Sequence, residues 1–182
     1  SEIRDKGHGN IISYSRKIFI PLTKLCRDVC HYCTFSRDPQ KNQNSYMKPD
    51  EVMELLREGE KYGCKEALFT LGDKPELRYT RAKKELHKLE HETTLSYLYE
   101  TAERVLKETT LLPHINAGVM TTDDLRNLRK VSVSQGLMLE SISPRLHEKG
   151  KPHHGSPDKN PMSELRLLGK QELKKSLLLQ AC

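Results

Sequence analysis

The sequence predicts an α/β protein with a parallel sheet, because short β-like runs alternate along the chain with longer runs of helical periodicity. Hydrophobic residues make up 35% and charged residues 31% of the 182 residues, which is typical of a folded but rather polar chain. This length is sufficient for one ordinary domain with a single core. No apolar run approaches the roughly 20 residues that a transmembrane helix needs.

Four short apolar runs are the predicted strands. The first, residues 16–23, reads RKIFIPLT and ends at a cysteine-rich loop. The second covers residues 66–72, and the third and fourth cover residues 111–120 and 134–141. Each run is too short for an ordinary helix and is bounded by polar or glycine-containing segments, as expected for strands.

Three helices are predicted between these strands. Residues 49–63 begin with Pro49 and acidic residues and stop at Gly63, which are typical helix start and stop signals. Residues 94–109 place apolar residues on one face, at Leu95, Leu98, Ala102, Val105 and Leu106. Residues 121–131 begin with Thr and Asp at cap positions, which predicts a third, shorter helix.

Two further segments have no clear apolar period. Residues 77–92 are strongly charged and are expected to form a loop or, equally, an exposed helix. Residues 142–161 are rich in Pro, Gly and Ser, which predicts irregular structure. The sequence contains no internal repeat and no low-complexity tract.

The charge distribution does not favour a nucleic-acid partner. The net charge of +6 is diffuse, and the chain has no Trp and three Phe, whereas nucleic-acid binders combine a dense basic patch with aromatic residues. The first ten residues, SEIRDKGHGN, contain no apolar signal region. We therefore expect no membrane partner and a cytoplasmic location. An organellar location stays open, because the chain lacks a starting Met and is expected to begin inside a longer product.

Three of the five cysteines, Cys26, Cys30 and Cys33, are crowded into the stretch LCRDVCHYCTF. In a chain without an export signal, this C-x3-C-x2-C spacing indicates metal or redox chemistry rather than disulfides. A structural zinc site takes four ligands, usually as two separated pairs, and no second pair is present. Three thiolates suit a [4Fe-4S] cluster in which each binds one iron and the fourth iron stays open. The spacing alone leaves a zinc site or a chance grouping open.

An open iron can chelate the amino and carboxylate groups of S-adenosylmethionine (SAM). A reduced cluster can then pass one electron to the sulfonium, which breaks a C–S bond and forms a 5′-deoxyadenosyl radical. The C-x3-C-x2-C pattern, with an aromatic residue before its last cysteine, resembles that of the radical SAM superfamily. Further stretches, ALFTLGDKPE, LLPHINAGVM, GLMLESISPRL and PHHGSPDK, resemble the cyclising part of the FO synthase family over about residues 3–168.

The resemblance implies a role for each matching residue. Cys26, Cys30 and Cys33 would ligate the cluster, and Tyr32 would lie against the adenine of SAM. The GDKPE stretch stands where the superfamily binds SAM, which implicates Gly72, Asp73, Lys74 and Pro75. A glycine lets the backbone approach the ligand closely, and exposed carbonyls accept from its ammonium. The alternative for this stretch is a simple strand-ending turn.

Polar residues near the predicted strand ends are further candidates. In a (β/α) barrel the carboxyl ends of the strands face the active site, so Glu140 is expected at the cofactor, and His114 and Asn116 at the substrate. The alternative is that loop backbone satisfies these side chains. The PHHGSPDK stretch would fold over the site and bring to the substrate His153, Asp158 and Lys159. A solvated loop is the alternative for this stretch.

The resemblance also implies a reaction. It is the radical cyclisation of 5-amino-5-(4-hydroxybenzyl)-6-(D-ribitylimino)-5,6-dihydrouracil, a tyrosine-derived adduct of ribityl-diaminouracil, to 7,8-didemethyl-8-hydroxy-5-deazariboflavin with release of ammonia. The implied partners are a reductant such as ferredoxin or flavodoxin and the radical SAM subunit or domain that couples tyrosine. Two alternatives stay open: a radical SAM enzyme of the menaquinone or biotin pathway, and a non-catalytic cluster-binding remnant.

The match to the family ends near residue 168. Ala117, Gln135 and Lys151 are mild departures from its pattern, whereas residues 169–182, GKQELKKSLLLQAC, resemble nothing in it. A full barrel of this type needs on the order of 200 residues or more. We therefore expect residues 1–168 to form the N-terminal part of a radical SAM (β/α) barrel of the TIM type, with about four β/α units and an unrelated tail. Such an arc leaves sheet edges uncovered and indicates a truncated product.

Overall fold

The structure is a computed structural model that describes residues 2–12, 14–40, 43–138, 140–141 and 143–156, and the backbone of 177–180. Its centre is a parallel sheet of five strands that follow one another in chain order. The strands are β1 (Lys17–Ile20), β2 (Glu66–Thr70), β3 (Leu112–Asn116), β4 (Ser134–Met138) and β5 (Leu177–Gln180). The strand order never reverses, which is the arrangement of a barrel arc rather than of a doubly wound sheet.

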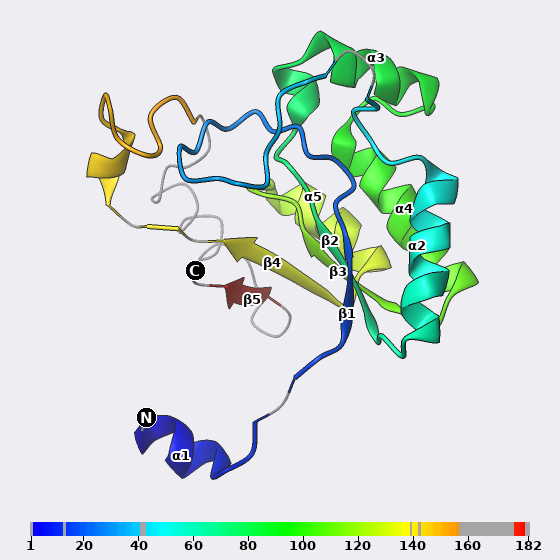
Figure 1. Ribbon diagram of the computed structural model, residues 1–182, viewed down its shortest axis with the longest axis vertical. Helices are drawn as coiled ribbons and strands as arrows, with labels where there is room; N and C mark the ends of the chain where they lie inside the picture. The colour runs from blue at the N-terminus through cyan, green and yellow to red at the C-terminus, as the bar shows by residue number, and fades with distance from the viewer. Residues whose placement is uncertain are drawn as a thin grey trace.

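The helices that connect the strands cover one face of the sheet (Figure 1). The helices are α1 (Glu2–His8), α2 (Pro49–Lys61), α3 (Thr80–Lys88), α4 (Thr94–Glu108) and α5 (Thr122–Leu128). Three short 3₁₀ turns are η1 (Pro75–Leu77), η2 (Arg129–Val131) and η3 (Pro144–His147). Thr93 and Thr121 cap α4 and α5 by accepting a backbone N–H three residues later, which explains where these helices begin.

The core lies between the sheet and helices α2 and α4. Successive strand residues point to opposite faces, so the outward set that includes Ile20, Phe69 and Ile115 is fully buried against the helices. The helices contribute the fully buried side chains of Leu56, Leu98 and Val105. The opposite, inner face of the sheet is the wall that would line a barrel, and it carries the functional candidates of β3.

The parallel α/β fold and the four expected strands are confirmed. The expected helices at residues 49–63 and 94–109 are present as α2 and α4, and the third is α5 followed by η2. Within residues 77–92 the exposed-helix alternative is correct, because α3 forms there. Neither α1 nor β5 was predicted; β5 pairs with β4 and raises the number of strands from four to five.

The chain before β1 extends away from the sheet (Figure 1). Helix α1 contains no buried residue, and the side chains of Ile11, Ile12 and Tyr14 are 76%, 78% and 85% exposed. Strands β1 and β5 are the two edges of the sheet. Among the described residues, no helix is both long enough and apolar enough to cross a membrane.

Candidate functional site

The cysteine loop, residues 25–36, follows β1 and packs against the turn after β2. The N–H of Gly72 donates to the carbonyl of Thr23 at 3.0 Å, and the N–H of Arg27 donates to the carbonyl of Asp73 at 2.9 Å. A Cβ atom at Gly72 would lie 1.9 Å from the carbonyl oxygen of Leu25, far inside van der Waals contact. Glycine is therefore required here by the close approach of the two backbone segments, whatever ligand the turn binds.

Each of the three loop cysteines has a polar contact at its sulfur. The Cys26 Sγ accepts the N–H of Asp73 at 3.2 Å, and the Cys33 Sγ accepts the N–H of Ser36 at 3.3 Å. The Cys30 Sγ lies 3.7 Å from the hydroxyl oxygen of Ser156. Hydrogen bonds to the sulfur ligands are among the factors that set the properties of an iron–sulfur cluster.

Cys26 is partly buried, whereas Cys33 is exposed. Burial raises the pKa of its thiol to about 11, against the opposing effect of backbone N–H donors from Asp28 and Asp73. This pKa describes the metal-free chain, in which the thiol is protonated at neutral pH. Metal binding deprotonates a coordinating cysteine and offsets the cost of burying its charge.

The donor set fits a [4Fe-4S] cluster better than a single metal ion. Within the described part of the chain, no three His, Cys, Asp or Glu side chains are grouped closely enough to hold one ion. A structural zinc site needs four ligands at roughly 2.0 to 2.3 Å from one centre. A four-iron cluster instead takes one thiolate at each of several corners, so its ligands stand further apart. Three thiols on one loop match the number of protein ligands of a cluster with one open corner.

Asp73 connects the cysteine loop to the ends of β2 and β3. Its carboxylate is almost fully buried and accepts from Arg27 Nε at 2.8 Å and from Lys74 Nζ at 3.0 Å. Lys74 also donates to the carbonyl of Val119, in the segment after β3. Gly118 has a φ of +75° and packs on Asp73, where a Cβ atom would lie 2.8 Å from the carboxylate. The Asp73 side chain is thus engaged by protein cations.

The remainder of the GDKPE stretch forms a tight turn. Lys74 adopts a left-handed conformation with a φ of +30°, and the buried Pro75 begins η1. Left-handed backbone is unfavourable for a lysine, so the surrounding contacts must hold this conformation. The structure therefore contains the strand-ending turn, in which Gly72, Asp73 and Pro75 are buried and Lys74 and Glu76 are partly buried.

Tyr32, in the cysteine loop, contacts His153. The Tyr32 hydroxyl lies 2.9 Å from His153 Nε2, and the two ring centres are 5.5 Å apart. Burial, followed by the nearby Glu140 carboxylate, raises the pKa of Tyr32 above its ordinary value. Three predicted site residues thus lie together, and the Tyr32 side chain is still 49% exposed. Asp158 and Lys159, which were predicted from the same stretch as His153, lie outside the described residues.

His114 and Asn116 lie on the inner face of β3. Asn116 is buried at the carboxyl end of the strand, as expected. His114 lies two residues earlier, in the middle of the strand, with Nδ1 at 2.6 Å from the Ser134 hydroxyl. Its Nε2 is buried and has no hydrogen-bond partner among the described residues. Burial, followed by the charge of Lys17, lowers the pKa of His114 despite the opposing effect of Glu66.

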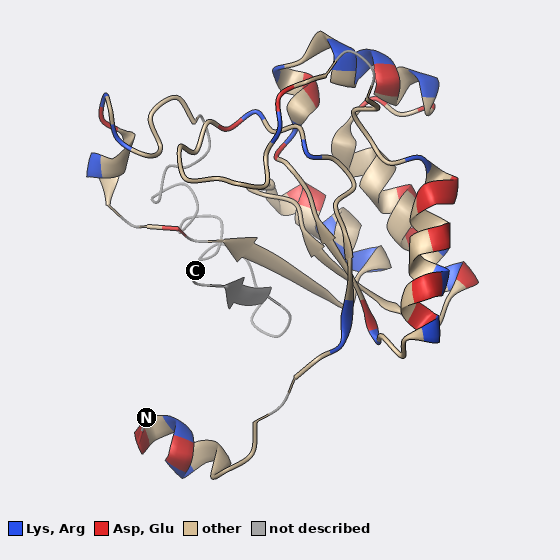
Figure 2. Ribbon diagram, in the orientation of Figure 1, with Lys and Arg blue, Asp and Glu red and all other residues tan. Residues whose placement is uncertain are grey.

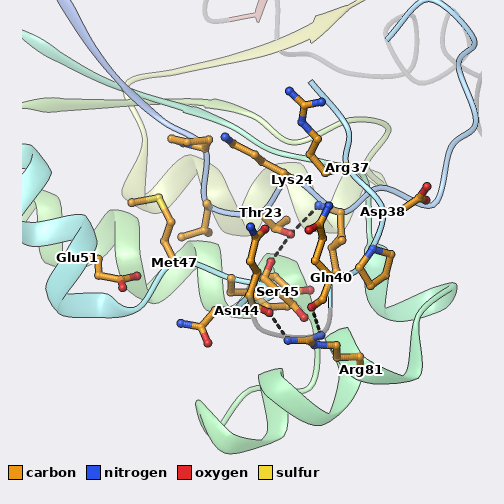
Figure 3. Close-up of a pocket in the computed structure, with 16 residues that line it drawn as sticks. Thr23, Lys24, Arg37, Asp38, Gln40, Asn44, Ser45, Met47, Glu51 and Arg81 are labelled. Atoms are coloured by element: carbon orange, nitrogen blue, oxygen red, sulfur yellow. Dashed lines mark hydrogen bonds between the residues drawn. The ribbon is translucent and has the colours of Figure 1, made fainter. Parts of the chain in front are cut away.

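A pocket of about 390 Å³ lies beside the cysteine loop, between the end of β1 and residues 37–47 (Figure 3). Arg81 reaches into its wall and donates to the carbonyls of Gln40 and Gln43. The Thr23 hydroxyl donates to the carbonyl of Ser45 at 2.7 Å. None of the predicted site residues is among those that line this pocket. Its described contacts support the chain that follows the cysteines, and it is separate from the predicted cofactor site.

Comparison with known proteins identifies the family of the chain. Residues 20–159 match the profile of the Radical SAM superfamily. The chain belongs to this superfamily. It is 52% identical over 162 residues to an FO synthase of Mycobacterium tuberculosis (strain CDC 1551 / Oshkosh), a match that covers 86% of this chain and 19% of that protein.

Two further similarities extend this result. The chain is 44% identical over 158 residues to the 7,8-didemethyl-8-hydroxy-5-deazariboflavin synthase of Methanopyrus kandleri, covering 87% of this chain and 47% of that enzyme. It therefore spans less than half the length of both relatives. The structure of the FeFe-hydrogenase maturase HydG from Carboxydothermus hydrogenoformans shares its fold, with a TM-score of 0.70 at 20% identity, over 99% of this chain and 38% of that one.

Sequence reasoning missed two residues that support the cysteine loop. Arg27 lies between the first two cysteines. The one signal for its ion pair with Asp73 is that the two side chains carry opposite charges. Ser156 lies inside the PHHGSPDK stretch, which was expected to face the substrate. No local pattern indicates that its hydroxyl contacts the cysteine loop, because the partners are more than a hundred residues apart in the chain.

Proposed function

We propose that this chain is the cluster-bearing part of an enzyme that makes 7,8-didemethyl-8-hydroxy-5-deazariboflavin. Its substrate would be the tyrosine-derived adduct 5-amino-5-(4-hydroxybenzyl)-6-(D-ribitylimino)-5,6-dihydrouracil, which is cyclised with release of ammonia. The observation that carries the proposal is the 52% and 44% identity to two enzymes named for this product. The match to the superfamily over residues 20–159, which contain the cysteine loop and the GDKPE stretch, supports it.

In this proposal Cys26, Cys30 and Cys33 hold a [4Fe-4S] cluster with one open iron, where SAM binds. When bound, the reduced cluster supplies the electron that cleaves SAM. Tyr32 is a half-exposed residue of the loop, and its ring would pack against the adenine. The backbone of the GDKPE turn would accept from the ammonium of SAM. Asp73 would support this turn without contacting SAM, because its carboxylate already accepts hydrogen bonds from Arg27 and Lys74.

The inner face of the sheet would receive the substrate. Asn116 at the carboxyl end of β3 would be nearest the cofactor, and Glu140 would contact the cofactor ribose. His114 lies earlier in the strand on the same face, and its buried Nε2 has no hydrogen-bond partner among the described residues. This nitrogen would bind a polar group of the ribityl or uracil moiety. His153, Asp158 and Lys159 remain proposed substrate contacts, although His153 already contacts Tyr32.

Two partners complete the proposal. A one-electron donor such as ferredoxin or flavodoxin is needed, because the cluster must be reduced before each SAM cleavage. The activity that joins tyrosine to the diaminouracil would come from a second radical SAM subunit or domain. The superfamily match and the identity to an FO synthase imply this reaction, and the reaction in turn requires both partners.

The test is anaerobic reconstitution of the chain with iron and sulfide. We expect about four irons per chain, as a [4Fe-4S] cluster requires, and loss of cluster in Cys26→Ala, Cys30→Ala and Cys33→Ala. Cys64→Ala is the matched control, because Cys64 lies outside the loop and packs against the core. A wild-type chain that binds no iron would refute the cluster assignment.

The substrate is tested separately with the loaded chain, SAM and a chemical reductant. Release of 5′-deoxyadenosine that depends on the adduct, together with formation of the deazaflavin chromophore, supports the proposed reaction. Deoxyadenosine release that does not respond to the adduct would reject this substrate while leaving the cluster assignment intact.

A further inference from the structure

A short segment lies along the cysteine loop and holds it. This segment, residues 152–156, which we call the clamp segment, is more than a hundred residues away from the loop in the chain. The N–H of His31 donates to the carbonyl of Pro152 at 3.0 Å. The N–H of Val29 donates to the hydroxyl oxygen of Ser156 at 2.8 Å. The two ends of the clamp segment therefore bind two alternate amides of the loop, on either side of Cys30.

The clamp segment is itself ordered by a tight turn. The N–H of Ser156 donates to the carbonyl of His153 at 3.1 Å, and the N–H of His153 donates to the carbonyl of Leu146 at 2.9 Å. Gly155 has a φ of +88°, a conformation that a side chain disfavours. The Ser156 hydroxyl is therefore presented to the loop in one position, and the residue is only 7% exposed.

Iron binding at Cys30 would set the direction of its contact with Ser156. A serine hydroxyl has one proton to donate and two lone pairs to accept with. One lone pair accepts the Val29 N–H, and the Cys30 Sγ lies 3.7 Å from the same oxygen. A free Cys30 thiol could donate or accept, but a cysteine bound to iron has lost its proton and can only accept. With iron bound, Ser156 must be the donor.

We propose that Ser156 is a positioning residue that holds Cys30 for the cluster and tunes the reduction potential of that cluster. This inference rests on the proposed function, because it assumes that Cys30 is a cluster ligand. Reduction adds negative charge to the cluster and its sulfur ligands, so a hydrogen bond to Cys30 stabilises the reduced state more than the oxidised state. The Ser156 hydroxyl therefore raises the reduction potential and makes the cluster easier to reduce.

The first test compares Ser156→Thr with Ser156→Val in the full chain reconstituted with iron and sulfide. Thr and Val have nearly the same shape, and only Thr keeps the hydroxyl. Spectroelectrochemical titration should show a more negative midpoint potential for Ser156→Val than for Ser156→Thr. A tenfold fall in the ratio of reduced to oxidised cluster at a fixed potential corresponds to a shift of 59 mV for a one-electron couple. Equal midpoints for the two variants would overturn the tuning role.

The second test uses the metal-free chain and does not depend on a cluster. Hydrogen–deuterium exchange of the peptide that spans Val29 to Tyr32 should be several-fold faster in Ser156→Val than in Ser156→Thr. Ser132→Ala is the control, because its buried hydroxyl donates to the carbonyl of Leu128, away from the cysteine loop. It should change neither the exchange nor the potential.

The two tests separate the possible failures. If exchange near Val29 is the same in the Thr and Val variants, the positioning role is wrong even when both variants bind iron. If the wild-type chain binds no iron, the proposed function fails, the tuning role fails with it, and the exchange experiment alone decides the positioning role.

Discussion

Replacement of Gly72 by alanine should damage the fold and the site together. The added Cβ atom would lie 1.9 Å from the carbonyl oxygen and 2.6 Å from the carbonyl carbon of Leu25, and 2.9 Å from the Cys26 Cβ. Real Cβ contacts are rarely closer than 3.4 Å, so the two backbone segments must separate by about 1.5 Å. Two of the three nearest atoms belong to backbone, so a side-chain rotation cannot relieve the clash.

The free-energy cost follows from this displacement. Overpacking a close contact typically costs about 1–3 kcal/mol. A separation of this size also breaks the hydrogen bond from Gly72 to Thr23, and that from Asp73 to the Cys26 sulfur. Each lost hydrogen bond contributes roughly 0.5–1.5 kcal/mol. We therefore expect a loss of about 2–6 kcal/mol, which is a large part of the roughly 5–15 kcal/mol that stabilises an ordinary domain.

Urea denaturation followed by circular dichroism measures this loss as a fall in the midpoint concentration. Gly7→Ala is the control, because nothing among the described residues lies within 4 Å of a Cβ placed there. Gly59→Ala is an intermediate case, since its new Cβ would meet the side chain of Ile18 at 2.8 Å rather than backbone. A Gly72→Ala midpoint equal to that of Gly7→Ala would refute the reasoning.

Three other predictions each rest on one residue. Asp73→Asn removes the charge that pairs with Arg27 and Lys74, so we expect a loss of about 2–3 kcal/mol in urea denaturation, reduced from the fully buried case because both cations are partly exposed. The pKa of buried His114 is lowered, so the unfolded chain binds the proton first as the pH falls below 6.5, and the folded state loses stability there. The urea midpoints of His114→Gln at pH 7.5 and pH 5 should therefore differ less than those of the wild type. Thr121→Ala removes the cap of α5 and should cost roughly 1 kcal/mol by thermal denaturation, and an unchanged melting temperature would contradict that role.

Local patterns were enough to predict most of the fold. In helix α4 the predicted apolar face is confirmed at Leu98, Ala102 and Val105, which are fully buried, and at the partly buried Leu95, whereas Leu106 is 41% exposed. Helix α3 could not be decided from sequence, because only Ala82 and Leu86 of its nine residues are buried. Its remaining residues are polar, and a polar segment forms a helix or a loop according to contacts that it makes elsewhere.

The candidate site was predictable only as far as its local spacing reached. The C-x3-C-x2-C pattern predicts three cluster ligands, because the cysteines that form it lie on one loop. The reason for Gly72 could not be read from sequence, since the atoms that exclude a side chain belong to Leu25, 47 positions earlier. The contact between Ser156 and the cysteine loop could not be predicted from the sequence either, because its partner Val29 is 127 positions away.

These long-range contacts show how the cysteine loop is held independently of much of a barrel. The turn after β2 supports Cys26 through the N–H of Asp73, and the clamp segment approaches Cys30 through Ser156. Cys33 is supported within its own loop by the N–H of Ser36. All three supports therefore come from residues 36–156, which lie within the 140-residue span that matches the superfamily. Under the proposed function, cluster binding should consequently need only this span, whereas turnover would also need the walls that enclose the substrate.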